Sequence, residues 1–357
     1  MKVLVGLSGG VDSAVTALLL KQQGYDVVSA RMSIWKEKPN FKKPETCTHA
    51  ACYSDETLNI ASAKKVAEEL GIPFYVIDCK DRYQEVVLDN FKSEYLSGRT
   101  PNPCVICNAL VKFGVLPKLA KESGIEFDKF ATGHYARVVE ENGRFYLKRG
   151  LATNKDQSYF LYKLTQEQLS QIMMPLGEYT KEEIREIAKK YNLEVSDRPD
   201  SQDFYDGDYN ELLDIEEKTG NIVDLDGKIL GQHNGIWNYT VGQRKGLCIS
   251  APEPLYVLEL RKDTNEVVVG YKDKTFKKKL IAKNLNWIAI DKLDTEIKAT
   301  AKIRSTQQPT EVVVRPLEND IIEVEFDEYQ KSIAIGQSVV IYDGDKVIGG
   351  GIIDSVQ

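Results

Sequence analysis

The sequence has neither a long apolar run nor an excess of positive charge. No apolar run approaches the ~20 residues that a membrane-spanning helix needs. The N-terminus leads directly into a glycine motif rather than a cleaved signal. With 54 acidic and 47 basic side chains, the formal net charge is −7, which argues against a general polyanion binder but leaves room for a local basic groove that reads one nucleic acid. We therefore expect a cytoplasmic protein without membrane contacts.

Cysteine is also scarce. Six cysteines among 357 residues, with no secretion signal, do not make a disulfide framework. In a reducing compartment, a close cysteine pair is more often catalytic or metal-binding. The hydrophobic share of 42% and the charged share of 28% are typical of a globular protein. At ~100–200 residues per domain, the length predicts two or three domains.

The first 135 residues alternate between strand and helix patterns. Apolar runs predict strands at 3–7, 26–32, 73–78 and 129–132, with helical segments between them. Such alternation indicates an α/β fold, in which a parallel sheet is covered by helices on both faces. Residues 33–55 show no periodicity and predict a long, mobile excursion from the second strand.

The pattern changes near residue 200. Before it, Thr180 with Glu183 forms a capping box that predicts a helix start. From about residue 220, short alternating segments are separated by glycine-rich turns, and 311–315, 321–326 and 338–342 are typical of strands. Asp343-Gly344 is a hairpin signal. Two small β-rich units therefore follow the α/β domain, the second beginning near the lysine-rich stretch 272–283.

The most specific motif is a glycine loop between a predicted strand and a predicted helix. Its glycines let backbone N–H groups approach phosphate oxygens, and the helix N-terminus adds partial positive charge. Asp12 is negative, so it fits this loop if it holds Mg²⁺ that bridges to phosphate. No Gly-Lys-Ser/Thr follows, so the loop is not a Walker motif. The alternative is a tight structural turn. The loop residues are Gly6, Leu7, Ser8, Gly9, Gly10, Val11, Asp12 and Ser13.

A cysteine pair, Cys104 and Cys107, follows two prolines. Its two-residue gap lets both thiolates reach one metal, or lets one thiol attack the other. Lys112 is a candidate cationic neighbour that would favour a nucleophilic thiolate. The alternative is a pair of buried structural cysteines. Together with Cys47 and Cys52, the pair is also compatible with a zinc site, or with an iron–sulfur cluster on three cysteines.

Four further segments are candidates for binding. Residues 131–135 end the fourth strand, where an open parallel sheet places ligands, and His134 lies there. Residues 154–159 combine a cation, amides and hydroxyls, or form a solvated turn. The basic turn at 239–247, with Arg244 and Lys245, suits a phosphate backbone. The run 272–283 carries six lysines; it is either a solvated face or a track for RNA phosphates.

These motifs together resemble the tRNA 2-thiouridylase family, MnmA. The glycine loop itself resembles the PP-loop of ATP pyrophosphatases, which transfer AMP to a substrate oxygen. The resemblance covers nearly the whole chain, through residues 8–13, 98–108, 131–135, 154–162, 242–247 and 342–353. It implies a Rossmann-like PP-loop domain at 1–200, a small tRNA-contacting domain at 201–272 and a C-terminal β-barrel at 273–357.

The same resemblance implies the reaction and its residues. The family adenylates the C2 oxygen of the wobble uridine (U34) of tRNA with ATP, then replaces it with sulfur to give 2-thiouridine. It thus implies a tRNA-uridine 2-sulfurtransferase, with tRNA and a sulfur donor protein or sulfide as partners. Cys107 would be the nucleophile that carries sulfur. ATP contacts are implied at 6–13, Met32 and Gly133, and tRNA contacts at His134, Lys155, Asp156, Gln157 and Gln337.

Two departures from the family put its usual cycle in doubt. Cys104 stands where the family has an acidic residue, and the segment 200–209 lacks the second catalytic cysteine. We therefore hypothesise that sulfide arrives on a four-iron, four-sulfur cluster whose ligands are Cys104, Cys107 and Cys52. Alternatives are thiolation of another RNA base, amidation of a small carboxylate, or a non-catalytic RNA-binding or metal-sensing protein. The sequence does not indicate the oligomeric state.

Overall fold

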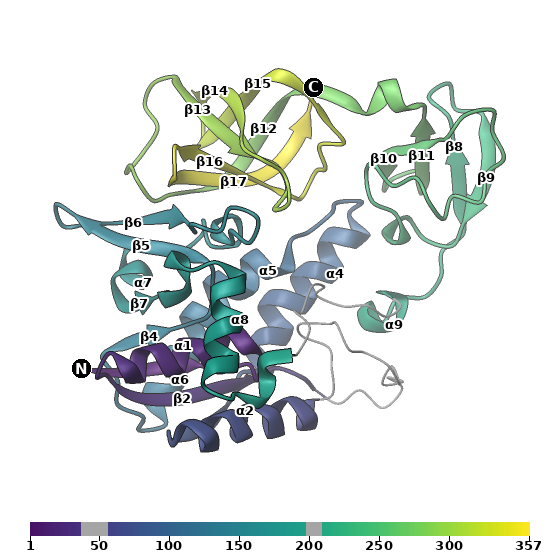
Figure 1. Ribbon diagram of the computed structural model, residues 1–357. Helices are drawn as coiled ribbons and strands as arrows, with labels where there is room; N and C mark the ends of the chain where they lie inside the picture. The colour runs from purple at the N-terminus through teal and green to yellow at the C-terminus, as the bar shows by residue number, and fades with distance from the viewer. Residues whose placement is uncertain (37–55, 198–208) are drawn as a thin grey trace. The chain divides into compact units, whose positions relative to one another are not determined.

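The computed structural model describes residues 1–36, 56–197 and 209–357, which belong to two compact units (Figure 1). By residue number, the first unit spans 1–87, 103–207 and 345–347, and the second spans 88–102, 208–344 and 348–357. The expected excursion at 33–55 and the segment 200–209 therefore lie almost entirely outside the described residues.

A five-stranded parallel sheet forms the centre of the first unit, in the order β3-β2-β1-β4-β7. Val3 of β1 lies opposite Val27 on one side and Lys129 on the other. The predicted α/β fold and its four strands are confirmed, whereas β7 has only two residues, too few for a sequence pattern to indicate it. The strands are β1 (Lys2–Gly6), β2 (Asp26–Ser33), β3 (Phe74–Asp78), β4 (Lys129–Ala131) and β7 (Ile172–Met173).

Three helices share one apolar core with this sheet: α1 (Val11–Gln22), α2 (Glu56–Leu70) and α8 (Lys181–Lys190) (Figure 1). α1 is buried along most of its length because it packs against β1, β2, α2 and α8. α8 begins with the predicted capping box. Thr180 Oγ1 accepts a hydrogen bond from the Glu183 N–H at 3.2 Å, and Glu183 Oε2 accepts one from the Thr180 N–H at 2.6 Å.

A continuous helical run packs beside β4. It consists of α5 (Pro103–Ile106), the π-helical η2 (Cys107–Val115) and α6 (Leu116–Glu122). Phe113 lies edge-on to Phe130 of β4, with ring centroids 5.7 Å apart. Among the described residues this 20-residue run is the one helix long and apolar enough to cross a membrane. The expectation that no apolar run approaches that length was therefore wrong, because an apolar face packed on a sheet gives the same composition.

An unexpected β-hairpin follows β4. β5 (Ala136–Glu141) and β6 (Arg144–Arg149) pair in antiparallel fashion, with Asn142 (φ 54°) and Gly143 (φ 78°) in the turn. Asn-Gly between alternating apolar residues is a strong hairpin signal, because both turn positions need positive φ. The other described elements are α3 (Lys80–Tyr83), η1 (Gln84–Leu88), η3 (Ser158–Phe160), α7 (Gln166–Gln171), η4 (Pro175–Glu178) and η5 (Glu194–Asp197).

A closed six-stranded barrel belongs to the second unit. Its order is β12-β15-β14-β13-β16-β17, and β12 also pairs with β17, which closes the barrel. The strands predicted at 311–315, 321–326 and 338–342 are confirmed, as is the hairpin after Asp343. Alternating apolar residues fill its interior. The strands are β12 (Phe276–Trp287), β13 (Ile297–Lys302), β14 (Thr310–Leu317), β15 (Ile321–Lys331), β16 (Ser338–Asp343) and β17 (Lys346–Val356).

A smaller sheet of the second unit has the order β10-β11-β8-β9. β11 runs parallel to β8, while the other two pairs are antiparallel. The expected change to β-rich structure after residue 220 is thus confirmed. The strands are β8 (Gly220–Val223), β9 (Ile229–His233), β10 (Tyr256–Arg261) and β11 (Glu266–Gly270). The helices of this unit are α4 (Asp89–Leu96), α9 (Tyr209–Leu213), η6 (Ile236–Asn238) and η7 (Lys272–Thr275).

Candidate active site

A cavity of about 400 Å³ opens at the carboxyl ends of β1, β2 and β4 in the first unit. This is the edge where an open parallel sheet presents its ligands. The cavity brings together most of the predicted nucleotide residues and three predicted RNA contacts. The predicted residues that line it are Gly6, Leu7, Ser8, Gly10, Val11, Asp12, Ser13, Met32, Gly133, His134, Lys155 and Gln157.

The glycine loop is held by its own serines. Ser13 Oγ accepts a hydrogen bond from the Ser8 N–H at 3.1 Å and donates one to the Gly10 carbonyl at 3.1 Å. Gly9 adopts φ +82°, and a Cβ there would meet Ser62 Oγ at 2.9 Å. The N-cap of α1, Gly10, offers no side-chain cap, so first-turn N–H groups and the helix dipole face the cavity as an anion site.

The carboxylate of Asp12 is held from two directions. Its Oδ1 accepts a hydrogen bond from Tyr135 OH at 2.8 Å and lies 2.7 Å from Lys181 Nζ. Lys181 is only 5% exposed, and it lines the cavity. Sequence reasoning missed it, although a signal was present. A lysine in the first turn of α8 opposes the helix dipole, so it needs an anionic partner nearby.

Gly133 is required by close packing as well as by the cavity. A Cβ there would lie 2.9 Å from the carbonyl carbon of Asp12 and 3.0 Å from the Ser13 nitrogen. The end of β4 therefore touches the start of α1, and any side chain would push the two apart. The expected approach to a nucleotide is one use of this glycine, and helix packing is a second.

His134 is a neutral ring at the edge of the cavity. Its Nδ1 lies 2.8 Å from Thr132 Oγ1, and its ring centroid lies 5.5 Å from that of Phe113. Burial, and then the charge of Lys112, hold the pKa of His134 well below its ordinary value. At neutral pH the ring is a hydrogen-bonding group rather than a cation for phosphate.

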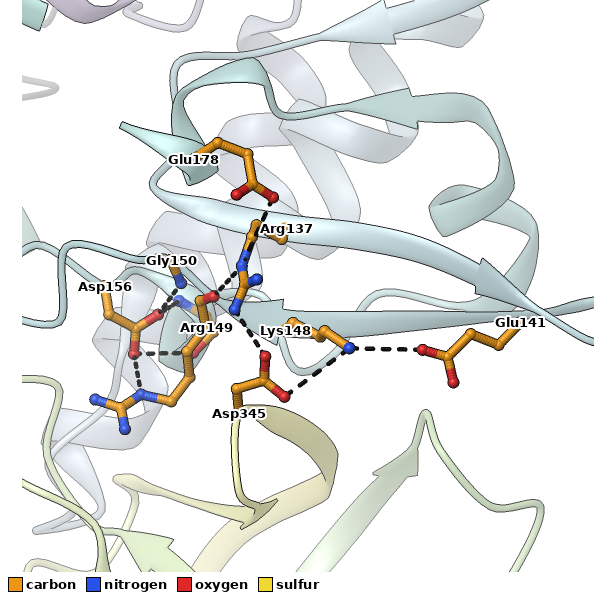
Figure 2. A network of polar contacts seen from close by, with 9 residues as sticks. Arg137, Glu141, Lys148, Arg149, Gly150, Asp156, Glu178 and Asp345 are labelled. Carbon is orange, nitrogen blue, oxygen red and sulfur yellow. Dashed lines mark hydrogen bonds and ion pairs between the residues drawn. The ribbon is translucent and has the colours of Figure 1, made fainter. Parts of the chain in front are cut away.

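Asp156 is a buried anchor of the loop that carries Lys155 and Gln157 (Figure 2). Its fully buried carboxylate accepts hydrogen bonds from the N–H groups of Gly150 and Ser158 at 3.3 and 3.0 Å. Ser158 Oγ and Arg149 Nε donate further bonds at 3.1 and 3.2 Å. The side chain expected to touch RNA therefore faces inward, because four donors hold it there. In this position it fixes the loop that carries Lys155 and Gln157, and a contact of Asp156 with RNA stays a prediction.

The hairpin beside this loop carries a balanced set of charges (Figure 2). Arg137 Nη2 donates to Asp345 Oδ2 at 2.7 Å. Lys148 Nζ lies 3.5 Å from Glu141 Oε1 and 4.0 Å from Asp345 Oδ1. Arg137 Nε also lies 4.0 Å from Glu178 Oε1. Since each of these cations has a carboxylate neighbour, this surface is not an open basic patch.

The predicted cysteine pair lies at the start of the helical run, outside the cavity lining. Cys107 is buried and Cys104 is partly exposed. Lys112, which lines the cavity, follows Cys107 by five residues in the same π-helical segment η2. No cluster of three metal-ligating side chains occurs within 1–36, 56–197 and 209–357. The proposed third ligand, Cys52, lies outside these ranges.

The other predicted contacts belong to the second unit. Gln337 Nε2 donates to the carbonyls of Thr100 and Pro101 at 3.2 and 3.1 Å, so it holds the segment that precedes the cysteines in the chain. Arg244 and Lys245 are exposed.

Comparison with known proteins agrees with this geometry. Family models described as "tRNA methyl transferase HUP domain", "tRNA methyl transferase PRC-barrel domain" and "Aminomethyltransferase beta-barrel domain" match residues 1–205, 213–271 and 277–353. A protein of Endomicrobium trichonymphae named tRNA-specific 2-thiouridylase MnmA is 49% identical, over 99% of each chain. One of Clostridium perfringens with the same name is 45% identical, over 99% of each chain.

Solved structures are similar only at a low level. A 4-thiouridine synthetase in complex with RNA and ATP is 18% identical and covers 56% of this chain and 42% of its own, with a TM-score of 0.33. A similarity at this level is no argument about function. The match of the first family model to more than half of the chain, and relatives at 45–49% identity over nearly its full length, are decisive. The chain belongs to the MnmA family.

Proposed function

We propose that the chain is an ATP-dependent tRNA-uridine 2-sulfurtransferase that converts the wobble uridine (U34) to 2-thiouridine in the cytoplasm. The observation that carries this proposal is the cavity in which an uncapped helix start, the glycine loop and the Asp12–Lys181 pair converge. The substrate in this proposal is taken from the names of the relatives, which are called tRNA-specific 2-thiouridylases. We keep the division into a PP-loop domain (1–200), a tRNA-contacting domain (201–272) and a barrel (273–357) as part of the proposal.

The first step makes the uridine oxygen a good leaving group. The C2 oxygen attacks the α-phosphorus of ATP, and the bond to pyrophosphate breaks. Backbone N–H groups of the loop and of the first turn of α1 stabilise the charge that develops on phosphate. Lys181, held at Asp12, adds a fixed positive charge in the same cavity. Preorganised donors of this kind need no rearrangement as the charge develops.

Asp12 is the residue that would hold Mg²⁺. Mg²⁺ takes one or two carboxylates together with phosphate oxygens, so the lack of a three-residue cluster within the described ranges does not count against it. Lys181 and Tyr135 both contact Asp12 Oδ1. The second carboxylate oxygen, Oδ2, is therefore the atom that would bind the ion. When bound, the ion would neutralise phosphate charge.

The second step transfers sulfur from a Cys107 persulfide. The terminal sulfur attacks C2, AMP leaves, and the uridine is joined to Cys107 through a disulfide. The Cys104 thiolate then attacks Cys107 Sγ, the S–S bond breaks, and its electron pair stays on the sulfur of 2-thiouridine. Residues three apart on a helical turn lie ~5–6 Å apart at Cβ, and a disulfide needs ~3.5–4.5 Å, so the turn from Cys104 to Cys107 must tighten by ~1–2 Å in this step.

Sulfide closes this cycle without an added reductant. Hydrosulfide attacks the Cys104–Cys107 disulfide, restores the Cys107 persulfide and releases the Cys104 thiolate. Cys104 would thereby replace the second catalytic cysteine that the segment 200–209 lacks. An iron–sulfur cluster stays the alternative source of sulfide, but the described residues supply only Cys104 and Cys107 for it, so we derive no step through a cluster.

The test is thiolation of an unmodified tRNA transcript with ATP, Mg²⁺ and sulfide. Cys107→Ala should abolish the product. Cys104→Ala, loaded beforehand as the persulfide, should accumulate a protein–tRNA adduct that a reducing agent releases. Cys248→Ser is the control, because Cys248 is an exposed cysteine of the other unit. Product from Cys107→Ala would contradict the persulfide. Stoichiometric iron and sulfide in anaerobically purified protein would favour the cluster over the dithiol cycle.

A further inference from the structure

The basic turn at 239–247 and the lysine run at 272–283 both contact Ser332, at the end of β15 in the second unit. A Cβ on Gly242 (φ +92°) would lie 2.5 Å from Ser332 Cβ, so the turn packs directly against the end of β15. Arg304 Nη2 bridges the two by donating to the carbonyls of Val241 at 3.2 Å and Ser332 at 3.1 Å. The turn is therefore fixed beside the last residue of β15, Lys331.

The same turn is fixed to the start of β10. The Gly242 N–H donates to the Val257 carbonyl at 2.8 Å, and the Val257 N–H donates to the Gln243 carbonyl at 2.9 Å. Tyr256 precedes Val257, and its ring lies 5.0 Å from Lys331 Nζ. The exposed Arg244 and Lys245 thus project from a turn that two backbone hydrogen bonds and the Arg304 side chain hold against these strand ends.

Strand register gathers lysines and aromatic rings at this place. In the antiparallel pair of β12 and β15, Phe276 lies opposite Lys331, and Lys278 Nζ lies 5.8 Å from the Tyr329 ring centroid. Phe276 and Lys331 share a face because they lie directly opposite each other. The strand pairing is interrupted between Lys277 and Lys279, so the contact between Lys278 and the Tyr329 ring, rather than strand alternation, places those two side chains together. We call this cluster the lysine–aromatic patch, formed by Tyr256, Phe276, Lys278, Tyr329 and Lys331.

The patch combines two lysines with exposed aromatic rings. Tyr329 is 66% exposed and Phe276 is 36% exposed. In the described part of the chain, Lys278 and Lys331 contact aromatic rings and form no ion pair with a carboxylate. Lys279, one residue away, pairs instead with Glu323 and Glu325. Asp327 and Glu328 precede Tyr329 in β15, so the patch is a local feature rather than a uniformly positive face.

We propose that the lysine–aromatic patch and the adjoining basic turn bind the substrate RNA away from the reaction centre, with phosphates on the lysines and an unpaired base on Tyr329. This rests on the proposed function, which makes RNA the substrate. An acidic protein would need only the lysine and arginine side chains for binding, and not the exposed aromatic rings. Exposed rings beside unpaired lysines are what single-stranded nucleic acid uses, because every base has a face that stacks.

The test measures the affinity of the full-length chain for an unmodified tRNA transcript across a salt series from ~50 to ~300 mM. The double variant Lys278→Gln/Lys331→Gln should bind about tenfold more weakly at low salt, and the slope of log K against log salt should fall by ~1.4–1.8. Tyr329→Ala should weaken binding about fivefold or more without changing the slope, and Tyr329→Phe should restore it. Lys298→Gln, an exposed lysine of β13, is the control for charge.

The outcomes separate this proposal from the proposed function. A wild-type chain that neither binds nor thiolates tRNA would overturn the function, and the patch with it. A wild-type chain that thiolates tRNA, with patch variants that match Lys298→Gln in affinity and slope, would overturn the patch alone. If the patch variants bind tRNA normally but fail to thiolate it only when a donor protein replaces sulfide, then the lysine–aromatic patch binds that protein instead of RNA. Thermal unfolding of each variant checks that the fold is retained.

Discussion

At the scale of single residues, the buried Lys181 is the most informative side chain of the site. Lys181→Met keeps the length of the side chain but removes the charge that lies 2.7 Å from Asp12 Oδ1. We expect the tRNA-dependent release of pyrophosphate from ATP to slow by about 100-fold or more, the usual effect of removing one preorganised charge. Lys190→Met, at the exposed end of the same helix, should leave the rate unchanged. Equal rates in both variants would exclude Lys181 from the first step.

The sequence indicated most of the glycine-loop residues that line the cavity, but not the partners that hold them. The place of Gly6 to Ser13 could be predicted, because a contiguous motif between a strand and a helix encodes the loop. Lys181 and Tyr135 reach Asp12 from 169 and 123 residues away in the sequence. Such contacts depend on how β4 and α8 pack onto α1, which no local pattern contains. Asp156 shows the converse, since a polar residue in a polar loop gave no sign that its carboxylate is buried.

At the scale of elements, the π-helix η2 begins at Cys107 and carries Lys112, which lines the cavity. A π-helix widens the turn and weakens the main-chain hydrogen bonds. Gln168 compensates, because its Nε2 donates to the carbonyls of Ala109 at 2.8 Å and Phe113 at 3.1 Å. Its Oε1 accepts from the Thr165 N–H at 3.0 Å, which caps α7. One side chain thus joins α7 to the helix that begins at Cys107.

Gln168→Glu separates these two roles. The carboxylate keeps an acceptor for the Thr165 N–H, but it places negative charge against two carbonyl oxygens in place of a donor. We expect η2 to lose about 1–3 kcal/mol of local stability, seen as faster amide hydrogen exchange in residues 107–116. Gln171→Glu, exposed on the same helix, serves as the control. Unchanged exchange at 107–116 in Gln168→Glu would mean that η2 is stable without this side chain.

Helices and strands with a clear hydrophobic period could be predicted from the sequence, whereas elements that form by packing against a neighbour could not. The strands of the parallel sheet and three barrel strands followed from apolar runs and alternation. The helical run from 103 to 122 was missed, because Gly114 and Pro117 inside it are poor helix formers and interrupt its apolar spacing. The hairpin at 136–149 was missed despite its Asn-Gly turn. Two-residue β7 depends wholly on its neighbour β4.

At the scale of the whole molecule, each unit holds one described histidine with a lowered pKa. His134 belongs to the first unit and His233 to the second. His233 Nδ1 accepts from the Gly235 N–H at 3.0 Å, and its Nε2 lies 3.2 Å from the Asn265 carbonyl. Burial lowers the pKa of both rings. The two units therefore share a response to acid, although they have different folds.

The sign of that response follows from proton linkage. An unfolded histidine has a pKa of ~6.5, and the folded value of each ring lies below it. Between these values the unfolded state binds more protons, so stability falls as pH falls, by up to ~1.4 kcal/mol per pH unit for each ring. Below the folded pKa no further stability is lost from that group. Acid should therefore loosen both units, starting near the unfolded value.

Replacing one histidine at a time should remove most of the acid response of the unit that contains it. Native-state hydrogen exchange at about pH 7.5 and about pH 5.5, corrected for intrinsic rates, would show lower protection of β8 and β9 in acid. His233→Gln should remove most of that difference in the second unit and leave the difference in the first unit intact. His134→Gln should do the reverse, so each variant is the control for the other. If both units lost protection to the same extent in all three proteins, carboxylates rather than histidines would govern the acid response.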